Sequence, residues 1–297
     1  MKKISREHIT YLFGRDQQPV ADIYSGEAVA FETLDALGGR VKTHADALSV
    51  SIPPTQGNPA TGPVRVVGAE PGDTLGVTIL DIKLGDFGYG RVKGGGVIID
   101  ELRPPVANLT PVRDGIVHFN DRIRFRARPM VGVAGVAPAG EPVHTFYPGP
   151  HGGNLDINEL AVGSTLYLPV AAPGALLAIG DVHASMGDGE LNGGGLDIDA
   201  EVTVQVSTHQ GLGWRWPVIE TPDAWCICAS APTLAEAIRQ ATSDMTTLLA
   251  RRLGMSREEA FILIGAAGHA RIGQAAALPM DVTAYLRISK EIMPAAF

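Results

Sequence analysis

Apolar and polar residues alternate along several stretches of the chain, most clearly over 196–206 (LDIDAEVTVQV). There Leu196, Ile198 and three valines fall on one face, while Asp197 and Asp199 fall on the other. Alternation with a period of two residues indicates a half-buried β-strand. Similar strand-like stretches occupy 41–52, 63–70, 74–82, 117–136, 165–171 and 176–182.

A helical pattern appears only late in the chain. Thr233-x-x-Glu236 has the form of a capping box, and an amphipathic apolar stripe follows it. A second box, Ser256-x-x-Glu259, opens a shorter apolar segment. These signals predict two consecutive helices near 233–265.

Composition supports a β-rich fold. The 297 residues include 36 glycines and 21 prolines, an excess over the usual ~12% that indicates many tight turns. A further strand-like stretch lies at 280–288, and no repeat or separating linker is visible. We predict a mainly β protein with sandwich- or barrel-like layers and a short C-terminal helical segment near 233–265. One unit over 1–297 is expected, with two fused β subdomains as the alternative.

Charge argues against several partners. The chain has 24 basic and 32 acidic residues, a net charge of −8, and the basic residues are scattered. Binding to nucleic acid or to an anionic membrane surface needs concentrated lysine and arginine. We therefore expect no nucleic acid and no membrane partner, and the low positive charge suits a small neutral substrate.

The sequence also suggests a compartment. Charged residues interrupt the first 19 positions, and no run of about 18 apolar residues occurs, so neither a signal peptide nor a membrane span is expected. Cys226 and Cys228 lie in an apolar run (AWCICAS) typical of inert buried thiols. A reducing cytoplasm fits these features best.

His44 and Asp46 are the first candidate metal ligands. On a strand over 41–52 they would point to the same side, about 6.5 Å apart along the chain. Imidazole and carboxylate groups at that spacing can converge on one metal ion. The alternative is a hydrogen-bonded, half-buried histidine beside a surface aspartate.

A second candidate lies where the strand over 176–182 ends. In GDVHASMGDGE, Asp181 and His183 are again two residues apart, and Asp188 and Glu190 follow among glycines. Such a cluster is typical of a metal shell with a general base, because the glycines allow a close approach to a ligand. An ordinary polar hairpin tip is the alternative.

The third candidate is the loop HGGNLD. Gly152 and Gly153 could present backbone N–H groups to a developing oxyanion, and Asp156 or His151 could bind a metal. A loop of this composition is also common as a purely structural element.

Other chemistries find less support. No Gly-x-Ser-x-Gly elbow is present, and the glycine runs 94–96 and 193–195 match no phosphate-binding pattern. The acids near 188–199 do not follow the spacing of an EF-hand calcium loop. They are more typical of a solvated face, with Asp197 as the main exception because it adjoins a glycine run.

Taken together, the motifs resemble those of the acetamidase/formamidase family. The resemblance rests on the order of THADALSVSI, GPVRVVGAEPGDTLGVTILDI, FYPGPHGGNLD, GSTLYLPV, GDVHASMGDGE, EVTVQV and the late GHARIGQAA to AYLRI region. It covers about residues 31–294. Members of this family are mostly β, assemble as homo-oligomers, and hydrolyse short amides to the acid and ammonia.

The resemblance implies the roles of individual residues. It points to His44, Asp46, Asp156, His183 and Glu190 as the polar residues of the site, with Asp181 and Asp188 close by. It also implies a divalent metal, with zinc as the first expectation and calcium as the alternative. In one place the chain departs from the family pattern. LNGGGLD at 191–197 replaces a commoner Gly-Thr motif, which changes the pocket's shape and therefore its substrate.

These observations give one leading hypothesis and its rivals. The leading hypothesis is a metal-dependent hydrolase of formamide or acetamide, in which His44, Asp46, His183, Asp156 and Asp181 surround the metal and Glu190, Asp188, Gly152 and Gly153 act in catalysis. A non-catalytic, metal-stabilised β binding protein is one rival, and a metallohydrolase of a larger amide or carbamoyl substrate is another. Apolar residues on the predicted helices suggest a homodimer or higher homo-oligomer, and the alternative is that both helices cover the sheet of their own subunit.

Overall fold

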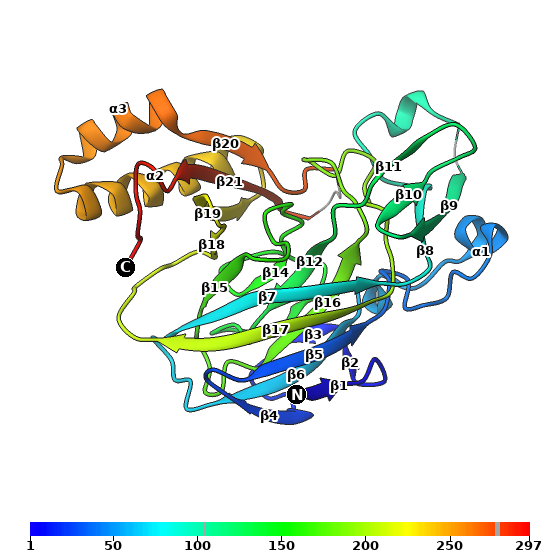
Figure 1. Cartoon of the computed structure of the whole chain (residues 1–297), viewed down its shortest axis with the longest axis horizontal. Helices are drawn as coiled ribbons and strands as arrows, with labels where there is room; N and C mark the ends of the chain where they lie inside the picture. The colour runs from blue at the N-terminus through cyan, green and yellow to red at the C-terminus, as the bar shows by residue number, and fades with distance from the viewer. Residues whose placement is uncertain (104, 277–279) are drawn as a thin grey trace.

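The computed structural model describes residues 1–103, 105–276 and 280–297. Strands dominate this part of the chain, and the two longer helices lie together near its C-terminus (Figure 1). The prediction of a mainly β protein with a C-terminal helical segment is therefore confirmed.

The largest sheet in the described residues has nine strands. Most neighbours are antiparallel, and β1 pairs with β5 in parallel. In sheet order its strands are β1 (Lys2–Ile4), β5 (Ala28–Thr33), β17 (Ala200–His209), β7 (Thr74–Leu84), β15 (Thr165–Pro169), β18 (Val218–Glu220), β19 (Ala224–Ala231), β21 (Val282–Ser289) and β20 (His269–Ile272).

A second sheet carries most of the candidate site. Its strands, in order, are β14 (Gly152–Asn154), β12 (Met130–Gly135), β16 (Leu177–His183), β6 (Ala60–Val67) and β2 (Ile9–Thr10), and β4 (Ala21–Tyr24) also pairs with β6. Because β12 lies between β14 and β16, residues at the ends of those two strands can meet across it.

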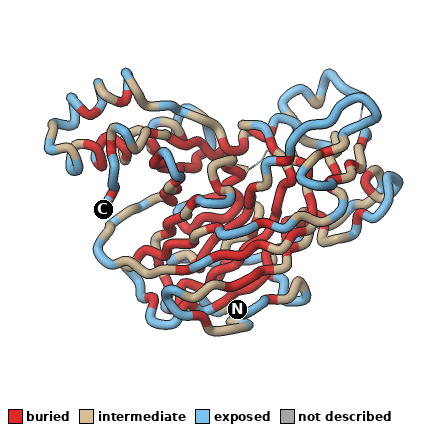
Figure 2. Tube along the Cα trace, in the orientation of Figure 1, coloured by how far each residue is buried: buried red, intermediate tan, exposed pale blue. Residues whose placement is uncertain are grey.

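The main core forms between these two sheets. Val202 and Val204 of β17 belong to one buried cluster with Val64 of β6 and Ile179 of β16. Each such side chain contributes roughly 1.5–3 kcal/mol on burial. Figure 2 shows the buried residues concentrated in these strands. The sandwich-like layering and the alternation predicted over 196–206 are thus confirmed.

Two smaller sheets complete the β structure. A four-stranded sheet contains β11 (Arg124–Arg126), β10 (Ile116–His118), β9 (Val106–Arg113) and β8 (Phe87–Val92), and a pair contains β13 (Val143–His144) and β3 (Leu12–Phe13). Short 3-10 helices lie at Pro54–Gln56 and Ile99–Glu101.

The helices begin where the capping boxes predict. Thr233 caps α2 (Leu234–Leu253) by accepting a hydrogen bond from the Glu236 backbone, and Gly254 ends it in the left-handed conformation, φ 66°. Ser256 and Glu259 form the capping box of α3 (Arg257–Ala267). Helix α2 packs against β19 and β21. In the described part of the chain, no helix is both long and apolar enough to cross a bilayer.

The strand predicted over 41–52 is wrong. This stretch contains a short helix, α1 (His44–Ser49), whose N-cap is Thr43. Thr43 Oγ1 accepts from the Asp46 backbone N–H at 3.1 Å, and Asp46 Oδ2 accepts from the Thr43 N–H at 2.7 Å. The same reciprocal capping box starts α3, and an N-cap threonine likewise starts α2; here the box outweighs an alternating pattern.

Candidate active site

Three buried side chains converge at one end of the second sheet. One ligand atom each from Asp156, Asp181 and His183 lies within 4.8 Å of the other two. The exposed fractions of the three residues are 0%, 3% and 1%. Asp181 and His183 end β16, and Asp156 follows β14 by two residues. The predicted candidates at these three positions are therefore brought together.

Gly132 of β12 makes this meeting possible. A Cβ atom at Gly132 would lie 2.5 Å from Asp156 Oδ1 and 3.1 Å from Asp181 Oδ2. Any other residue would therefore push into the space that the two carboxylates share. The absence of a side chain on the central strand lets its two neighbours place acids over it.

The site residues also share an unusual backbone conformation. Asn58, Asp156, Asp181 and Glu190 have φ of 48°, 47°, 49° and 48°. Residues other than glycine rarely adopt positive φ, and such strain concentrates at functional sites. At Asp181 it interrupts regular strand geometry, so the side chains of Asp181 and His183 do not follow simple alternation.

His183 lies among carboxylates. Its Nε2 is 3.4 Å from Asp181 Oδ1 and 3.3 Å from Asp197 Oδ1. Burial alone would lower the pKa of His183, but the neighbouring charges, chiefly that of Asp181, outweigh burial and raise its pKa well above the ordinary value. Gly195 packs against the ring, because a Cβ there would lie 2.6 Å from Nδ1.

The acids around His183 are hard to ionise together. Burial, followed by the charge of Asp181, raises the pKa of Asp156 to about 8. Burial raises the pKa of Asp197 to about 7, against the opposing effect of His183. The pKa of Glu190 is raised well above its ordinary range by burial and by Asp156. A cation bound among these groups would relieve their mutual repulsion.

Unpaired polar atoms give a second reason to expect a cation. Within the described structure, both carboxylate oxygens of Asp156, Asp181 Oδ1 and His183 Nδ1 are buried without a hydrogen-bond partner. Buried polar atoms are normally paired, so unpaired ones suggest a missing ion or water. One imidazole and two carboxylates are a suitable donor set for a divalent metal such as zinc. The residues present therefore fit a divalent ion.

The cluster opens into a cavity of about 310 Å³. Asp181, His183, Glu190 and Asp197 supply acidic and imidazole groups to its lining. The remaining described lining residues are Ala36, Leu37, Ile52, Pro53, Asn58, Tyr89, Arg91, Phe146, Asn154, Gly193, Gly194, Gly195 and Met280. Glu190 thus borders the same space as two of the candidate ligands, as its predicted role requires.

Asn58 is a site residue that sequence reasoning missed. Its Nδ2 donates to Asp181 Oδ2 at 3.0 Å and to Asn154 Oδ1 at 3.2 Å. These bonds orient one candidate metal ligand. The local sequence GNP is typical of any turn, so nothing in it distinguishes this asparagine.

Asp197 lies against His183 and not on a solvated face. Its carboxylate contacts His183, and its backbone exchanges hydrogen bonds with Tyr89 at 2.9 and 3.0 Å. The next acid on that face, Asp199, instead pairs with Arg6. Asp197 is therefore a candidate ligand or positioning group that the predicted set did not include.

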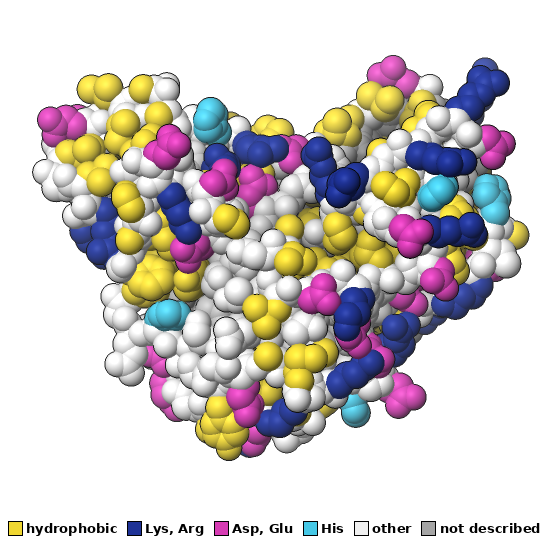
Figure 3. All heavy atoms as spheres, in the orientation of Figure 1, with side chains coloured by type: hydrophobic (Ala, Val, Ile, Leu, Met, Phe, Trp, Pro, Cys, Tyr) yellow, Lys and Arg dark blue, Asp and Glu magenta, His cyan; other side chains and the backbone are white. Residues whose placement is uncertain are grey.

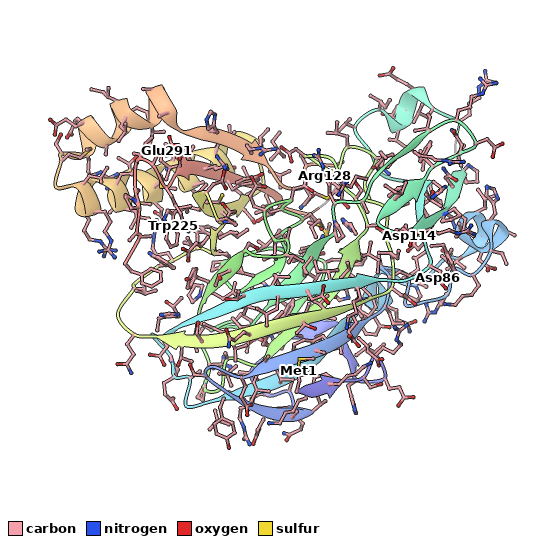
Figure 4. All side chains as sticks on the ribbon, viewed as in Figure 1. Met1, Asp86, Asp114, Arg128, Trp225 and Glu291 are labelled. Atoms are coloured by element: carbon pink, nitrogen blue, oxygen red, sulfur yellow. The ribbon has the colours of Figure 1, made fainter. Side chains whose placement is uncertain are left out.

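Asp188 does not face this cavity. Its Oδ2 accepts two hydrogen bonds from Arg271, and its Oδ1 accepts one from Asn158 at 2.9 Å. It lines a separate cavity of about 620 Å³ with Arg128 and Arg271. Arg128, labelled in Figure 4, lies in the region between the helices and the four-stranded sheet, where the surface is hollowed in Figure 3. The predicted catalytic role of Asp188 is corrected to an ion pair.

Gly152 and Gly153 lie in close backbone packing, and this argues against the predicted oxyanion role. The Gly152 N–H donates to the Gly149 carbonyl at 3.0 Å, so it is not free for a ligand. A Cβ at Gly152 would lie 2.2 Å from the Ala134 carbonyl oxygen, and one at Gly153 would lie 2.2 Å from that of Tyr147. Both glycines are buried, with φ of 90° and 83°.

His151, in the same loop, does not join the metal cluster either. It is buried against Phe13, with ring centroids 5.3 Å apart. Burial lowers its pKa to about 4, so the ring is neutral near pH 7.

His44 and Asp46 are not brought to the site. His44 is exposed on α1, and its Nε2 lies 3.0 Å from the Ala107 carbonyl oxygen. The Asp46 carboxylate accepts from the backbone N–H groups of Lys42 and Thr43. Their prediction as metal ligands is wrong because the strand that would align them is a capped helix.

Comparison with known proteins agrees with the hydrolytic chemistry that the geometry of the site suggests. The model of the acetamidase/formamidase family matches residues 5–146 and 139–223, more than half of the chain. The chain belongs to this family. A crystal structure of an acetamidase from Bacillus halodurans is 38% identical, with a TM-score of 0.94 and coverage of 98% of both chains.

Two other relatives extend the comparison. An acetamidase structure from Yersinia enterocolitica is 27% identical, with a TM-score of 0.91 over 98% of this chain and 92% of that one. A formamidase from Methylophilus methylotrophus is 27% identical over 59% of this chain and 58% of its own length. The match thus spans less than two thirds of the curated relatives' length.

Proposed function

We propose that this protein is a metal-dependent amidohydrolase that converts short linear amides to a carboxylic acid and ammonia. One observation carries the proposal: Asp156, Asp181 and His183 meet with unpaired buried atoms, and Asp181 and His183 line a cavity together with Glu190. Family membership and relatives named formamidase and acetamidase support the same chemistry.

Each residue has a distinct part in this reaction. Asp156, Asp181 and His183 would hold a divalent ion, zinc by first expectation, and Asn58 orients Asp181. Such an ion supplies polarisation of the amide carbonyl and a lowered pKa for water. Glu190 accepts the proton of the attacking water and returns it to the leaving nitrogen. The carbon–nitrogen bond then breaks, with water and amide giving acid and ammonia.

Burial prepares Glu190 for this role. Burial, followed by the charge of Asp156, raises the pKa of Glu190 well above its ordinary range, which makes its carboxylate a stronger base than an exposed one. The partly apolar lining limits competing water around the reacting groups.

The test combines elemental analysis with ammonia release. Purified protein should contain a stoichiometric divalent metal and release ammonia from formamide or acetamide, and chelation should abolish the activity reversibly. The opposing hypothesis is a metal-stabilised binding protein. It gains support if chelation lowers the melting temperature while no amide in a broad panel is hydrolysed with any added metal.

We also propose a homo-oligomer in a reducing cytoplasm. Phe261 and Ile262 of α3 are 60% and 72% exposed, which favours cover by a second copy. Cys226 and Cys228 are buried free thiols. Light scattering of the purified protein tests the assembly.

A further inference from the structure

The cavity is larger than a formamide or acetamide molecule requires. A water molecule takes about 30 Å³ in the liquid, so acetamide needs roughly 100 Å³. The cavity has about 310 Å³. Its volume therefore suits a substrate that extends beyond the amide group.

The lining contains one further charged group, Arg91 on β8. Among the described residues lining the cavity, Arg91 is the sole lysine or arginine. Its Nη1 donates to the Val50 carbonyl oxygen at 3.1 Å, and no described carboxylate lies within ion-pair distance of it. A guanidinium has five N–H donors, so several are left for a ligand.

Strand geometry relates Arg91 to the cluster around His183. Tyr89 pairs with Asp197, and a Cβ at Gly90 would lie 3.7 Å from the Gly195 carbonyl oxygen. Strand β8 therefore runs beside the glycine segment that contacts His183. Arg91 is two residues beyond Tyr89, about 6.6 Å along the strand. The Arg91 backbone is therefore offset along β8 by this spacing from the residue that pairs with Asp197, and both Arg91 and Asp197 line the cavity.

Glycines on both segments let the two backbones approach each other closely. A Cβ at Gly193 would lie 3.1 Å from the Gly95 carbonyl carbon, and one at Gly96 would lie 3.1 Å from the Asn192 Cα. The two glycine runs, which match no phosphate-binding motif, thus pack backbone against backbone. The run at 193–195 is also where the chain departs from the commoner family pattern.

We propose that the preferred substrate is an amide that also carries a carboxylate, and that Arg91 binds this carboxylate. Guanidinium and carboxylate form strong, directional, charge-assisted hydrogen bonds. The amide end would lie near Asp181, His183 and Glu190. Leu37 and Phe146 form an apolar part of the cavity wall. Hydrolysis needs only water and yields a dicarboxylate and ammonia. This inference rests on the proposed function and departs from the neutral substrate suggested by overall charge, because overall charge does not describe a local cavity.

The experiment compares three amides of similar length on the metal-containing protein. Succinamate carries the carboxylate, methyl succinamate is its neutral ester, and butyramide lacks the group. Wild-type kcat/KM should be at least about tenfold higher for succinamate, as expected for hydrogen bonds to a charged group. In Arg91→Met this preference should fall to near unity, mainly through KM, and Arg91→Lys should restore part of it.

Lys93 provides a matched control. Its Nζ donates to the same Val50 carbonyl oxygen at 2.9 Å, but Lys93 does not line the cavity. Lys93→Met should therefore leave the preference for succinamate intact. If Lys93→Met removes it as fully as Arg91→Met does, Arg91 acts only by holding the α1 loop, and the inference is wrong.

Calorimetry separates this inference from the proposed function. Succinate, the expected product, should bind wild-type protein at least about tenfold more tightly than Arg91→Met. Hydrolysis of acetamide without any preference for succinamate would overturn the inference and leave the proposed function standing. Arg91-dependent binding of succinate without hydrolysis of any amide would overturn the proposed function and leave the carboxylate site standing.

Discussion

The guanidinium of Arg271 holds the Asp188 carboxylate through two hydrogen bonds, from Nε at 2.8 Å and from Nη2 at 2.5 Å. Asp188 precedes Glu190 by two residues. The intervening Gly189 is bonded on both sides to the segment after β20, donating to the Gly273 carbonyl and accepting from the Ala275 N–H. The C-terminal strands thereby position the proposed general base.

Arg271→Met should lower kcat for acetamide about tenfold with little change in KM, because Glu190 would lose its fixed position. Arg271→Lys should recover part of the rate, and the pH dependence of kcat should broaden in the methionine variant. Stability should fall by less than about 1 kcal/mol, since the pair is partly exposed.

The control for this variant is Arg215→Met, which removes a different ion pair, with Asp244 of α2. It should leave kcat unchanged. Equal losses in the two variants would show that Arg271 has no specific link to Glu190.

Gly132→Ala should reduce metal content and activity together, because the new Cβ would occupy the space between Asp156 and Asp181. Overpacking of this kind typically costs about 1–3 kcal/mol. Circular dichroism would check that the variant folds. Gly140→Ala is the control, since no described atom lies within 4 Å of a Cβ there. Full metal content in folded Gly132→Ala would disprove the shared-space argument.

Glu190→Gln should keep the metal and lose turnover by about 10²–10⁴-fold, the usual contribution of a general acid–base group. His183→Ala should lose both, because it removes the imidazole of the cluster. Exposed Glu258 of α3 gives a control, Glu258→Gln, that should match wild type. Metal analysis and ammonia release on the same preparations distinguish these outcomes, and an active Glu190→Gln would reject the assigned role.

Metal-free protein should become less stable as pH rises. Raised pKa values of about 8 for Asp156 and about 7 for Asp197 mean that folding favours their protonated forms. The stability from these groups is fully present below their ordinary pKa near 4. It is lost as pH rises through about 7 to 8. Melting temperature with chelator should therefore fall between about pH 4 and pH 8 and level off above, and added metal should stabilise most at the upper end.

Asp156→Asn is the informative variant for this pH effect. It removes a buried charge while keeping the shape, so chelated variant protein should be more stable than chelated wild type near pH 9. It should also bind less metal. A pH-independent melting temperature for chelated wild type would argue against the crowding of acids at the site.

His44→Ala should retain metal and activity, because His44 is exposed on α1 and its Nε2 lies against the Ala107 carbonyl oxygen, away from the candidate site. Asp46→Ala should cost about 1 kcal/mol through loss of the helix cap, with metal content unchanged. Elemental analysis measures the metal content of both variants, and thermal unfolding measures the stability of Asp46→Ala. Loss of metal in His44→Ala would reinstate the original ligand prediction.

The predictions that the structure confirms most directly depend on residues close together along the chain. Capping boxes at Thr233 and Ser256 start α2 and α3, and alternation over 196–206 marks β17. The same type of signal at Thr43 and Asp46 competes with an alternating pattern and starts α1, so neither His44 nor Asp46 reaches the site. The organisation of 1–297 as one unit stays a prediction.

By itself, the sequence determined the mainly β class, the late helices and the candidacy of Asp156, Asp181, His183 and Glu190, because propensity, capping and short motifs act between residues close along the chain. Tertiary structure alone decided which candidates meet. It added Asn58 and Arg91, placed Asp197 against His183 and directed Asp188 toward Arg271. The physical reason is that the site spans three strands that are far apart in the sequence. Its geometry depends on the order of those strands, on left-handed backbone conformations and on the absence of a Cβ atom at Gly132.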